Sequence, residues 1–371
     1  MSDNECSLDI YVVIDNICTG GGIERVCSII LPLLAKRNRV TILGLLDDSS
    51  TPVYSFSDVE IRALGQSVPS GQLGYLKVLN KAFSILRKDQ PDVVLYLTMG
   101  RLSVFAAPFV AFNKKYMKDT CHIACEHVAF TSHSSTIQKM KRVAFKSYDK
   151  VVFLTERDLE NFSDMKKFVQ IPNPTPFSNI SAARHQPDNK KALAVGRLTA
   201  QKGFDLLIPA WKAFAEHHPD WKVVIVGEGE DRPMLEKMIL ESGLQDSCVL
   251  NGQSQDIESF YREADLMLMS SRFEGLPMSL IEAQSFALPI VSFDCETGPR
   301  EIVTHGQDGY LVPVSDTKGF AEAISKVVDE PATYASMSEE ASRNALRFDQ
   351  ERIVEQWQSL CMQAVTVRKT A

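Results

Sequence analysis

Short apolar runs alternate with longer segments of helical periodicity along the first half of the chain. Residues 10–14 form a β-branched run, and after three glycines the apolar positions of residues 23–34 recur every three or four residues. The same pattern predicts strands at residues 40–46, 93–97, 122–125 and 150–154, and helices at residues 73–87 and 137–146. Strands that alternate with helices indicate a parallel sheet covered on both faces.

Prolines and asparagines interrupt this pattern between residues 171 and 188, and the alternation then restarts. It predicts strands at 192–195, 221–226, 247–250, 266–269, 289–293 and 309–312, and helices at 203–215, 232–242, 257–263, 279–287, 299–303 and from 317 onward. We therefore predict two Rossmann-like α/β domains, residues 1–176 and 191–348, joined by a linker at 177–190. A final helix in 349–371 has one apolar face, which we expect to pack back toward the first domain.

Length and composition agree with this division. At 371 residues the chain is longer than one hydrophobic core usually grows, and 44% hydrophobic with 23% charged residues is typical of a globular protein. The polar first residues do not resemble a secretory leader, and no apolar stretch reaches 18 residues. We expect a cytoplasmic protein.

The charge is unevenly distributed. Lys and Arg outnumber Asp and Glu by 21 to 18 in residues 1–182 but are outnumbered by 19 to 29 afterwards. Eight basic residues face three acids between residues 114 and 150, which favours attraction to an anionic surface. The predicted helix there is basic and amphipathic, so it either docks to anionic lipid or an acceptor diphosphate, or is merely solvated; its basic residues are Lys139, Lys141, Arg142 and Lys146.

Two loops carry candidate anion-binding groups. Gly20, Gly21 and Gly22 lie between a predicted strand and helix, where backbone amides can approach a phosphate, although a tight turn explains them equally well. Arg197 and Lys202 follow the strand at 192–195 and place two cations in one short loop. Such a pair can neutralise a departing nucleoside diphosphate, or can simply be solvated.

Two carboxylates flank a third candidate loop. Glu274 lies on the loop after the strand at 266–269, and Glu282 lies about one and a half turns into the next predicted helix. Carboxylate oxygens bind vicinal hydroxyls well because both accept hydrogen bonds. One of them could therefore take sugar hydroxyls and the other a ribose, although a helix-capping or surface-paired acid is the ordinary explanation for any single glutamate.

These motifs together resemble the family-4 glycosyltransferases, which are retaining enzymes of the GT-B fold. The resemblance rests on Arg197 with Lys202, on the E-G-L-P-M-S-L-I-E-A stretch of residues 274–283 and on the strand before it, and it is dense from about residue 192 to 314. Residues 293–302 look like the T-G-P-x-E-I element of members that build lipid-linked oligosaccharides, O-antigen or capsule, often from UDP-galactose or UDP-N-acetylgalactosamine.

The resemblance implies a role for each matching residue. Gly21 and Gly22 would contact the diphosphate, with Arg197 and Lys202 as its counter-charges. The transferred sugar would be held by Glu274 with the amides near Gly275, Leu276 and Pro277, and the ribose by Glu282. The base is expected beside Gly227 and the loop of Gly252, Gln253 and Ser254, and His127 matches the family's histidine near sugar and acceptor.

The implied function is transfer of a hexose or N-acetylhexosamine from a UDP-sugar to a polyprenyl-diphosphate-linked glycan, by an enzyme peripheral to the inner face of the cell membrane. No D-x-D triplet occurs in the chain, so we expect no metal. We also expect no other cofactor and no nucleic-acid partner. Two alternatives stay open. One is a soluble acceptor, as in glycogen or sucrose-phosphate synthases, and the other is a nucleotide-sugar epimerase or binding protein on the same scaffold.

Overall fold

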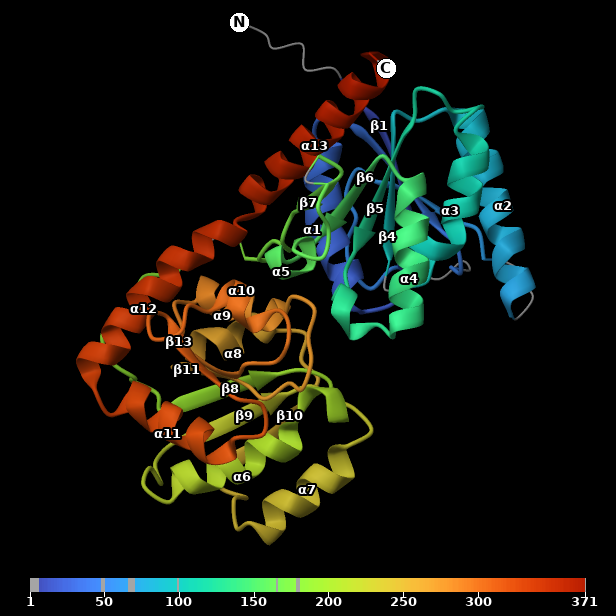
Figure 1. Ribbon diagram of the computed structural model, residues 1–371. Helices are drawn as coiled ribbons and strands as arrows, with labels where there is room; N and C mark the ends of the chain where they lie inside the picture. The colour runs from blue at the N-terminus through green and yellow to red at the C-terminus, as the bar shows by residue number, and fades with distance from the viewer. Residues whose placement is uncertain are drawn as a thin grey trace, which may run out of the picture. The chain divides into compact units, whose positions relative to one another are not determined.

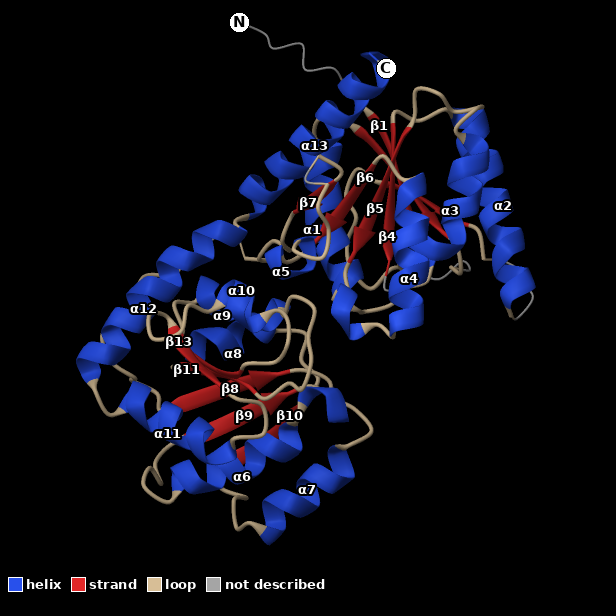
Figure 2. Cartoon of the chain, viewed as in Figure 1, coloured by secondary structure: helices blue, strands red, loops and turns tan. Residues whose placement is uncertain are grey.

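The computed structural model describes residues 7–47, 51–65, 71–98, 100–164, 166–177 and 181–370. The chain forms two compact units, Met1–Pro174 with Gln350–Ala371, and Thr175–Asp349. In each unit a sheet lies between layers of helices (Figure 2). The stretch 177–190, expected as a linker, belongs to the second unit. Its described part is tied down there, since the amides of Ser181 and Arg184 donate to the carbonyl of Ser285 and the hydroxyl of Ser338.

The first unit has seven parallel strands in the order β3-β2-β1-β4-β5-β6-β7. The sequence predicts all but β3 and β7, which are short strands at the two edges of the sheet, where one neighbour is missing and the apolar pattern is weaker. The strands are β1 (Asp9–Ile14), β2 (Arg39–Gly44), β3 (Glu60–Ala63), β4 (Val93–Thr98), β5 (Cys121–Glu126), β6 (Lys150–Phe153) and β7 (Phe168–Gln170).

Helices cover both faces of this sheet. The predicted helix after the glycines begins at Gly22 and buries the apolar stripe of Ile23, Val26, Ile30 and Leu34. The sequence pattern missed Leu102–Asn113, because this helix is apolar nearly all round and shows no periodicity. The helices are α1 (Gly22–Ala35), α2 (Gln72–Asp89), α3 (Leu102–Asn113), η1 (Phe130–Ser132), α4 (Ser135–Ala144), η2 (Phe145–Ser147), α5 (Glu156–Leu159) and α13 (Gln350–Thr370).

The C-terminal helix α13 belongs to the first unit and packs along α1 (Figure 1). Ile353, Trp357 and Cys361 form its buried stripe, at the four-residue spacing expected of one helix face. Its last turn is tied down by Arg368, whose guanidinium ion-pairs with Asp149 at 2.7 Å.

The second unit has six parallel strands in the order β10-β9-β8-β11-β12-β13, all of them predicted. They are β8 (Lys191–Val195), β9 (Lys222–Val226), β10 (Cys248–Gly252), β11 (Leu266–Met269), β12 (Ile290–Phe293) and β13 (Gly309–Val312). The helices are η3 (Ala200–Lys202), α6 (Phe204–Ala215), α7 (Arg232–Glu241), α8 (Ile257–Glu263), α9 (Met278–Ser285), α10 (Pro299–Ile302), α11 (Thr317–Val328), α12 (Pro331–Ala345) and η4 (Leu346–Phe348).

The strand order reverses once in each sheet, between β1 and β4 in the first unit and between β8 and β11 in the second. Loops at the carboxyl ends of such neighbouring strands diverge and leave a crevice where ligands bind in open α/β sheets. Within the residues described, no helix is both long and apolar enough to cross a membrane.

Candidate functional site

The two loops at the reversal point of the second sheet are joined backbone to backbone. Gly203 adopts φ +64°, and a Cβ there would lie 2.1 Å from the carbonyl oxygen of Ser270, so glycine is required. The Ser270 hydroxyl donates to the Lys202 carbonyl at 2.9 Å, and the Arg272 amide donates to the Gln201 carbonyl at 2.8 Å. The loop after β8 is therefore held against the loop after β11.

This arrangement brings Lys202 to Glu274. The Lys202 ammonium donates to Oε1 of Glu274 at 2.7 Å, and the Ser271 hydroxyl donates to the same oxygen at 2.7 Å. Among the described residues, Oε2 of Glu274 has no hydrogen-bond partner. One carboxylate oxygen is thus committed to the protein and the other remains a free acceptor. Sequence reasoning missed Ser271, whose position three residues before Glu274 was its only signal.

Arg197 differs from Lys202. Its side chain is exposed, and no acidic residue in the described part of the chain pairs with it. The neighbouring Arg272 is different again, because its guanidinium makes a bidentate pair with Asp205 at 2.8 and 2.6 Å. Of these cations, Arg197 is the one whose full charge is available to an anion at this edge of the sheet.

Glu282 lies on α9 and is buried, with 2% of its surface exposed. Its Oε2 accepts a 2.7 Å hydrogen bond from the hydroxyl of Tyr261 on α8, which is also buried. Tyr261 is a second residue that the sequence pattern did not single out. It fixes one oxygen of the carboxylate expected to bind a ribose.

Glycines mark the carboxyl ends of β8 to β10. A Cβ on Gly227, at φ +152°, would lie 1.9 Å from the carbonyl oxygen of Gly196, and the Gly227 amide donates to the Gly252 carbonyl at 3.0 Å. Beyond Gly252, Gln253 is exposed and the Ser254 hydroxyl accepts from the Asp256 amide. This edge therefore offers backbone and small polar groups, as the expected base site requires.

The loop of Gly275, Leu276 and Pro277 leads directly into α9. Pro277 is the residue before the first helical position, Met278, so the first-turn amides of α9 open toward this loop. Leu276 and Pro277 are buried and Gly275 is partly exposed. The loop can present backbone donors beside Glu274.

Gly21 and Gly22 lie at the start of α1, after β1, and both are exposed. A Cβ on Gly22 would meet no atom within 4 Å, which leaves room for a ligand. At Gly21, however, Oε2 of Glu24 lies 2.4 Å from the position of a Cβ. This first-turn carboxylate already faces the positive end of the helix, so a diphosphate there would have to displace it.

His127 follows β5 in the first unit. Its Nε2 is buried and has no hydrogen-bond partner among the described residues, and burial lowers the pKa of its imidazole to about 4. The ring borders a cavity of about 20 Å³ whose other lining residues are Val26, Cys27, Ile30, Leu31, Leu95, Leu97 and Trp357. At neutral pH His127 is therefore uncharged.

The prediction that Lys141 belongs to an exposed basic surface on α4 is wrong. Its side chain is fully buried, and its ammonium ion-pairs with Glu126, whose other oxygen accepts from the Ser103 hydroxyl at 2.6 Å. The helical period explains this, because Lys141 lies on the same face as buried Ala144 rather than beside Lys139.

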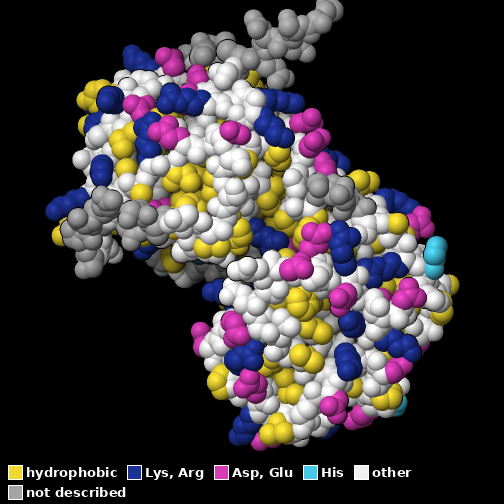
Figure 3. Space-filling model, turned by 180° about the vertical axis from the view of Figure 1, so that it is seen from behind, with side chains coloured by type: hydrophobic (Ala, Val, Ile, Leu, Met, Phe, Trp, Pro, Cys, Tyr) yellow, Lys and Arg dark blue, Asp and Glu magenta, His cyan; other side chains and the backbone are white. Residues whose placement is uncertain are grey.

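The remaining face of α4 is exposed. Lys139 on α4 and Lys146 on the following η2 are solvent-accessible, and Arg142 is exposed but rests over the rings of Phe130 and Phe162. Apolar residues lie among these cations, with Met140 50% and Val143 67% exposed, and no acidic residue occurs between His127 and Tyr148. On the face shown in Figure 3, by contrast, basic and acidic side chains are interspersed.

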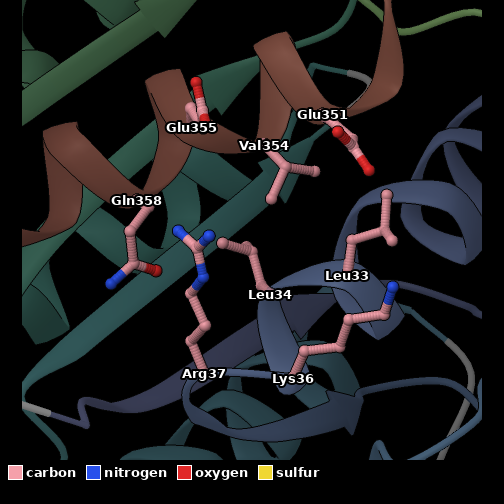
Figure 4. A pocket seen from close by; sticks show the side chains of 8 residues that line it. All are labelled: Leu33, Leu34, Lys36, Arg37, Glu351, Val354, Glu355 and Gln358. Carbon is pink, nitrogen blue, oxygen red and sulfur yellow. The ribbon is translucent and has the colours of Figure 1, made fainter. Parts of the chain in front are cut away.

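A larger pocket of about 140 Å³ lies between α1 and α13. Figure 4 shows Lys36 and Arg37 extending from the end of α1 toward α13, which carries Glu351 and Glu355. None of the predicted site residues lines this pocket. Its mixture of both charge signs indicates packing of the helix pair rather than an anion site.

The chain is similar to known glycosyltransferases. A family model described as glycosyl transferases group 1 matches residues 178–344. The amylovoran biosynthesis glycosyltransferase AmsD of Erwinia amylovora is 32% identical over 364 residues, which cover 95% of this chain and 99% of that protein. An uncharacterized glycosyltransferase of Haemophilus influenzae is 27% identical, over 93% of this chain and 97% of its own.

Two solved structures share the fold over nearly the whole chain. Anabaena HepE in complex with UDP aligns with a TM-score of 0.76 at 18% identity, covering 96% of this chain and all of that one. Sucrose-phosphate synthase of Thermosynechococcus elongatus aligns with a TM-score of 0.78 at 17% identity, covering 96% and 99%. With the two parallel sheets, these likenesses confirm the predicted GT-B fold.

Proposed function

Because the chain belongs to the glycosyl transferases group 1 family, we propose that it is a retaining, metal-independent glycosyltransferase of surface-polysaccharide assembly. The proposed donor is a UDP-sugar, with UDP-galactose or UDP-N-acetylgalactosamine favoured. The proposed acceptor is a glycan linked to polyprenyl diphosphate. The biosynthetic role of AmsD supports the assignment to polysaccharide assembly, and the UDP bound to HepE supports the nucleotide.

The environment of Glu274 carries the proposal. Oε1 is held by Lys202 and Ser271, whereas Oε2 has no partner among the described residues and can accept hydroxyls of the transferred sugar. This carboxylate lies on a loop at the reversal point of the sheet, where ligands bind in open α/β folds.

The leaving diphosphate is assigned to Arg197 and Lys202 of the second unit. In the proposed front-face reaction, the bond between the anomeric carbon and the β-phosphate oxygen breaks. The acceptor oxygen attacks from the same face and gives its proton to that phosphate oxygen. Preorganised positive charge stabilises the leaving group, at about 3 kcal/mol for each well-placed donor. With these cations in place, the reaction is proposed to need no metal.

The acceptor is assigned to the first unit. Neutral His127 can orient the attacking hydroxyl through a hydrogen bond, in either direction. The exposed basic and apolar face of α4 suits the surface of an anionic membrane, where the lipid-linked acceptor resides. We accordingly place the enzyme at the inner face of the cell membrane as a peripheral protein.

A donor panel tests the proposal. The thermal unfolding midpoint and the release of free nucleotide are measured with UDP-, GDP- and ADP-sugars, each with and without EDTA. Stabilisation by UDP and turnover of a UDP-sugar that survives EDTA are expected. Preference for GDP or ADP would overturn the donor assignment, and loss of turnover in EDTA would overturn metal independence.

The same enzyme preparation separates the two acceptor classes. Transfer is assayed with a polyprenyl-diphosphate-linked sugar and with the corresponding free sugar or sugar phosphate. The proposal expects transfer to the lipid-linked acceptor. Equal transfer to the free sugar would favour the alternative of a soluble acceptor.

A further inference from the structure

Residues 294–298, between β12 and α10, pack against the main chain of the loop that carries Glu274. Thr297 is 95% buried, and its hydroxyl donates a hydrogen bond to the main-chain carbonyl of Glu274, 23 residues away. The Thr297 carbonyl in turn lies 3.5 Å from the thiol of Cys295, which is also buried. This contact holds the main chain of Thr297 within its own segment, while its hydroxyl bonds to the neighbouring loop.

Gly298 reinforces this contact. It adopts φ +94°, and a Cβ there would lie 2.6 Å from the Gly275 carbonyl oxygen and 2.6 Å from Cδ of Pro277. Backbone atoms cannot move aside as a flexible side chain can, so only glycine permits this approach. Thr297 and Gly298 thus touch the loop at both ends of its Glu274–Pro277 stretch.

The side chain and the main chain of Glu274 are consequently fixed by different elements. Lys202 and Ser271 hold Oε1 of the carboxylate, while Thr297 holds the carbonyl of the same residue. If the carbonyl were released, the main chain of Glu274 could shift, and of these residues only Lys202 and Ser271 would still hold the carboxylate. A displacement of about 1 Å at a substrate-positioning group can cost on the order of 100-fold in rate.

We propose that Thr297 is a positioning residue for the transferred sugar. By holding the main-chain carbonyl of Glu274, it fixes the position from which the Glu274 carboxylate reaches the sugar. The inference rests on the proposed function, because it assumes that Glu274 holds the sugar. It predicts a selective effect of Thr297. Loss of its hydroxyl should impair use of the sugar part of the donor but not binding of the nucleotide, which is assigned to other residues. A purely structural threonine would have no such selectivity.

The test compares Thr297→Val, which removes only the hydrogen bond, with Thr297→Ser, which keeps it. For each variant, kcat/KM for the UDP-sugar and Kd for UDP are measured. Thr297→Val is expected to lower kcat/KM about tenfold or more while Kd for UDP stays within about twofold, and Thr297→Ser is expected to stay near the wild type. Gly298→Ala, which pushes the loop forward, is expected to show the same selective loss.

Thr120→Val is the matched control, because Thr120 is an equally buried threonine whose hydroxyl donates to a distant main-chain carbonyl, that of Pro91 in the first unit. It is expected to change thermal stability but not kcat/KM. Wild-type kcat/KM in Thr297→Val, or an equal loss in UDP affinity, would overturn the inference. Absence of transfer by the wild type with every UDP-sugar would instead overturn the proposed function.

Discussion

Nζ of Lys202 lies 2.7 Å from Oε1 of Glu274, although the two residues are 72 positions apart. The pair exists because the strand order reverses between β8 and β11, which sets the loops that follow these strands beside each other. A cation expected at the phosphates therefore also braces the carboxylate expected at the sugar. In the proposed complex, the sugar and the diphosphate of the donor would therefore be recognised by groups that depend on each other.

Removal of either partner should reduce transfer strongly. Glu274→Gln is expected to lower kcat/KM for the UDP-sugar by about 10- to 100-fold, because a hydrogen bond to a charged group is lost. Lys202→Ala is expected to lower kcat by about 100-fold or more, because charge at the leaving group is lost. Since the residues are in contact, the double variant should lose less than the product of the two single losses.

The control for this pair is Lys191→Ala, which breaks an exposed ion pair with Glu263 in the same unit. It should leave steady-state kinetics and the unfolding midpoint close to wild type, because exposed pairs contribute little. Transfer at wild-type rates in both Glu274→Gln and Lys202→Ala would contradict the donor assignment.

Arg197→Ala should weaken nucleotide binding without affecting stability. Its guanidinium has no acidic partner among the described residues, so its removal is expected to change the free energy of unfolding by less than about 0.5 kcal/mol. Loss of a charged contact to the diphosphate should raise Kd for UDP by about 10- to 100-fold in titration calorimetry. Arg343→Ala, an exposed arginine on α12, is the control. Unchanged UDP affinity in Arg197→Ala would remove it from the site.

Binding to anionic vesicles should depend on α4 and on Lys146 in the adjoining η2. Lys139→Gln with Lys146→Gln is expected to weaken sedimentation with phosphatidylglycerol vesicles about 30-fold, at roughly 1 kcal/mol for each cation near the surface. Val143→Asp should weaken it as well, by placing a charge on the apolar part of this face. Leu240→Asp changes a comparably exposed residue, 63% against 67%, on α7 and should have no effect. Equal binding by all variants would contradict docking through α4.

Stability should fall in mild acid because of buried His122. Burial lowers the pKa of its imidazole to about 3, and its Nδ1 lies 3.0 Å from the hydroxyl of Tyr96. The unfolded chain, with a histidine pKa near 6.5, binds the proton more tightly than the folded one. The stabilisation is therefore complete above about pH 6.5 and is lost as the pH falls toward 3.

At pH 5 this single group should reduce the free energy of unfolding by about 2 kcal/mol relative to pH 7, as measured by urea denaturation. His122→Gln should show a correspondingly weaker pH dependence, whereas His185→Gln, which changes an exposed histidine, should resemble the wild type. An unchanged pH dependence in His122→Gln would show that another group is responsible.

The sequence by itself determined the two sheets, because strands buried on both faces must be continuously apolar, and in the second unit every strand was predicted. It also placed Arg197, Lys202, Glu274 and Glu282 in loops and a helix at strand ends. Edge strand β3 and the uniformly apolar helix α3 were not predicted, since neither shows the periodic alternation of apolar and polar residues on which such predictions depend.

Only the tertiary structure decided which groups meet. Hydrogen bonds from Ser271 to Glu274 and from Tyr261 to Glu282 depend on loop and helix packing that no local pattern encodes. The clearest case is Lys141, which sequence reasoning grouped with the exposed cations of α4. A helix turns by about 100° at each residue, so cations close together in the sequence point in different directions. Lys141 faces the core, where it meets Glu126, whereas Lys139 faces water.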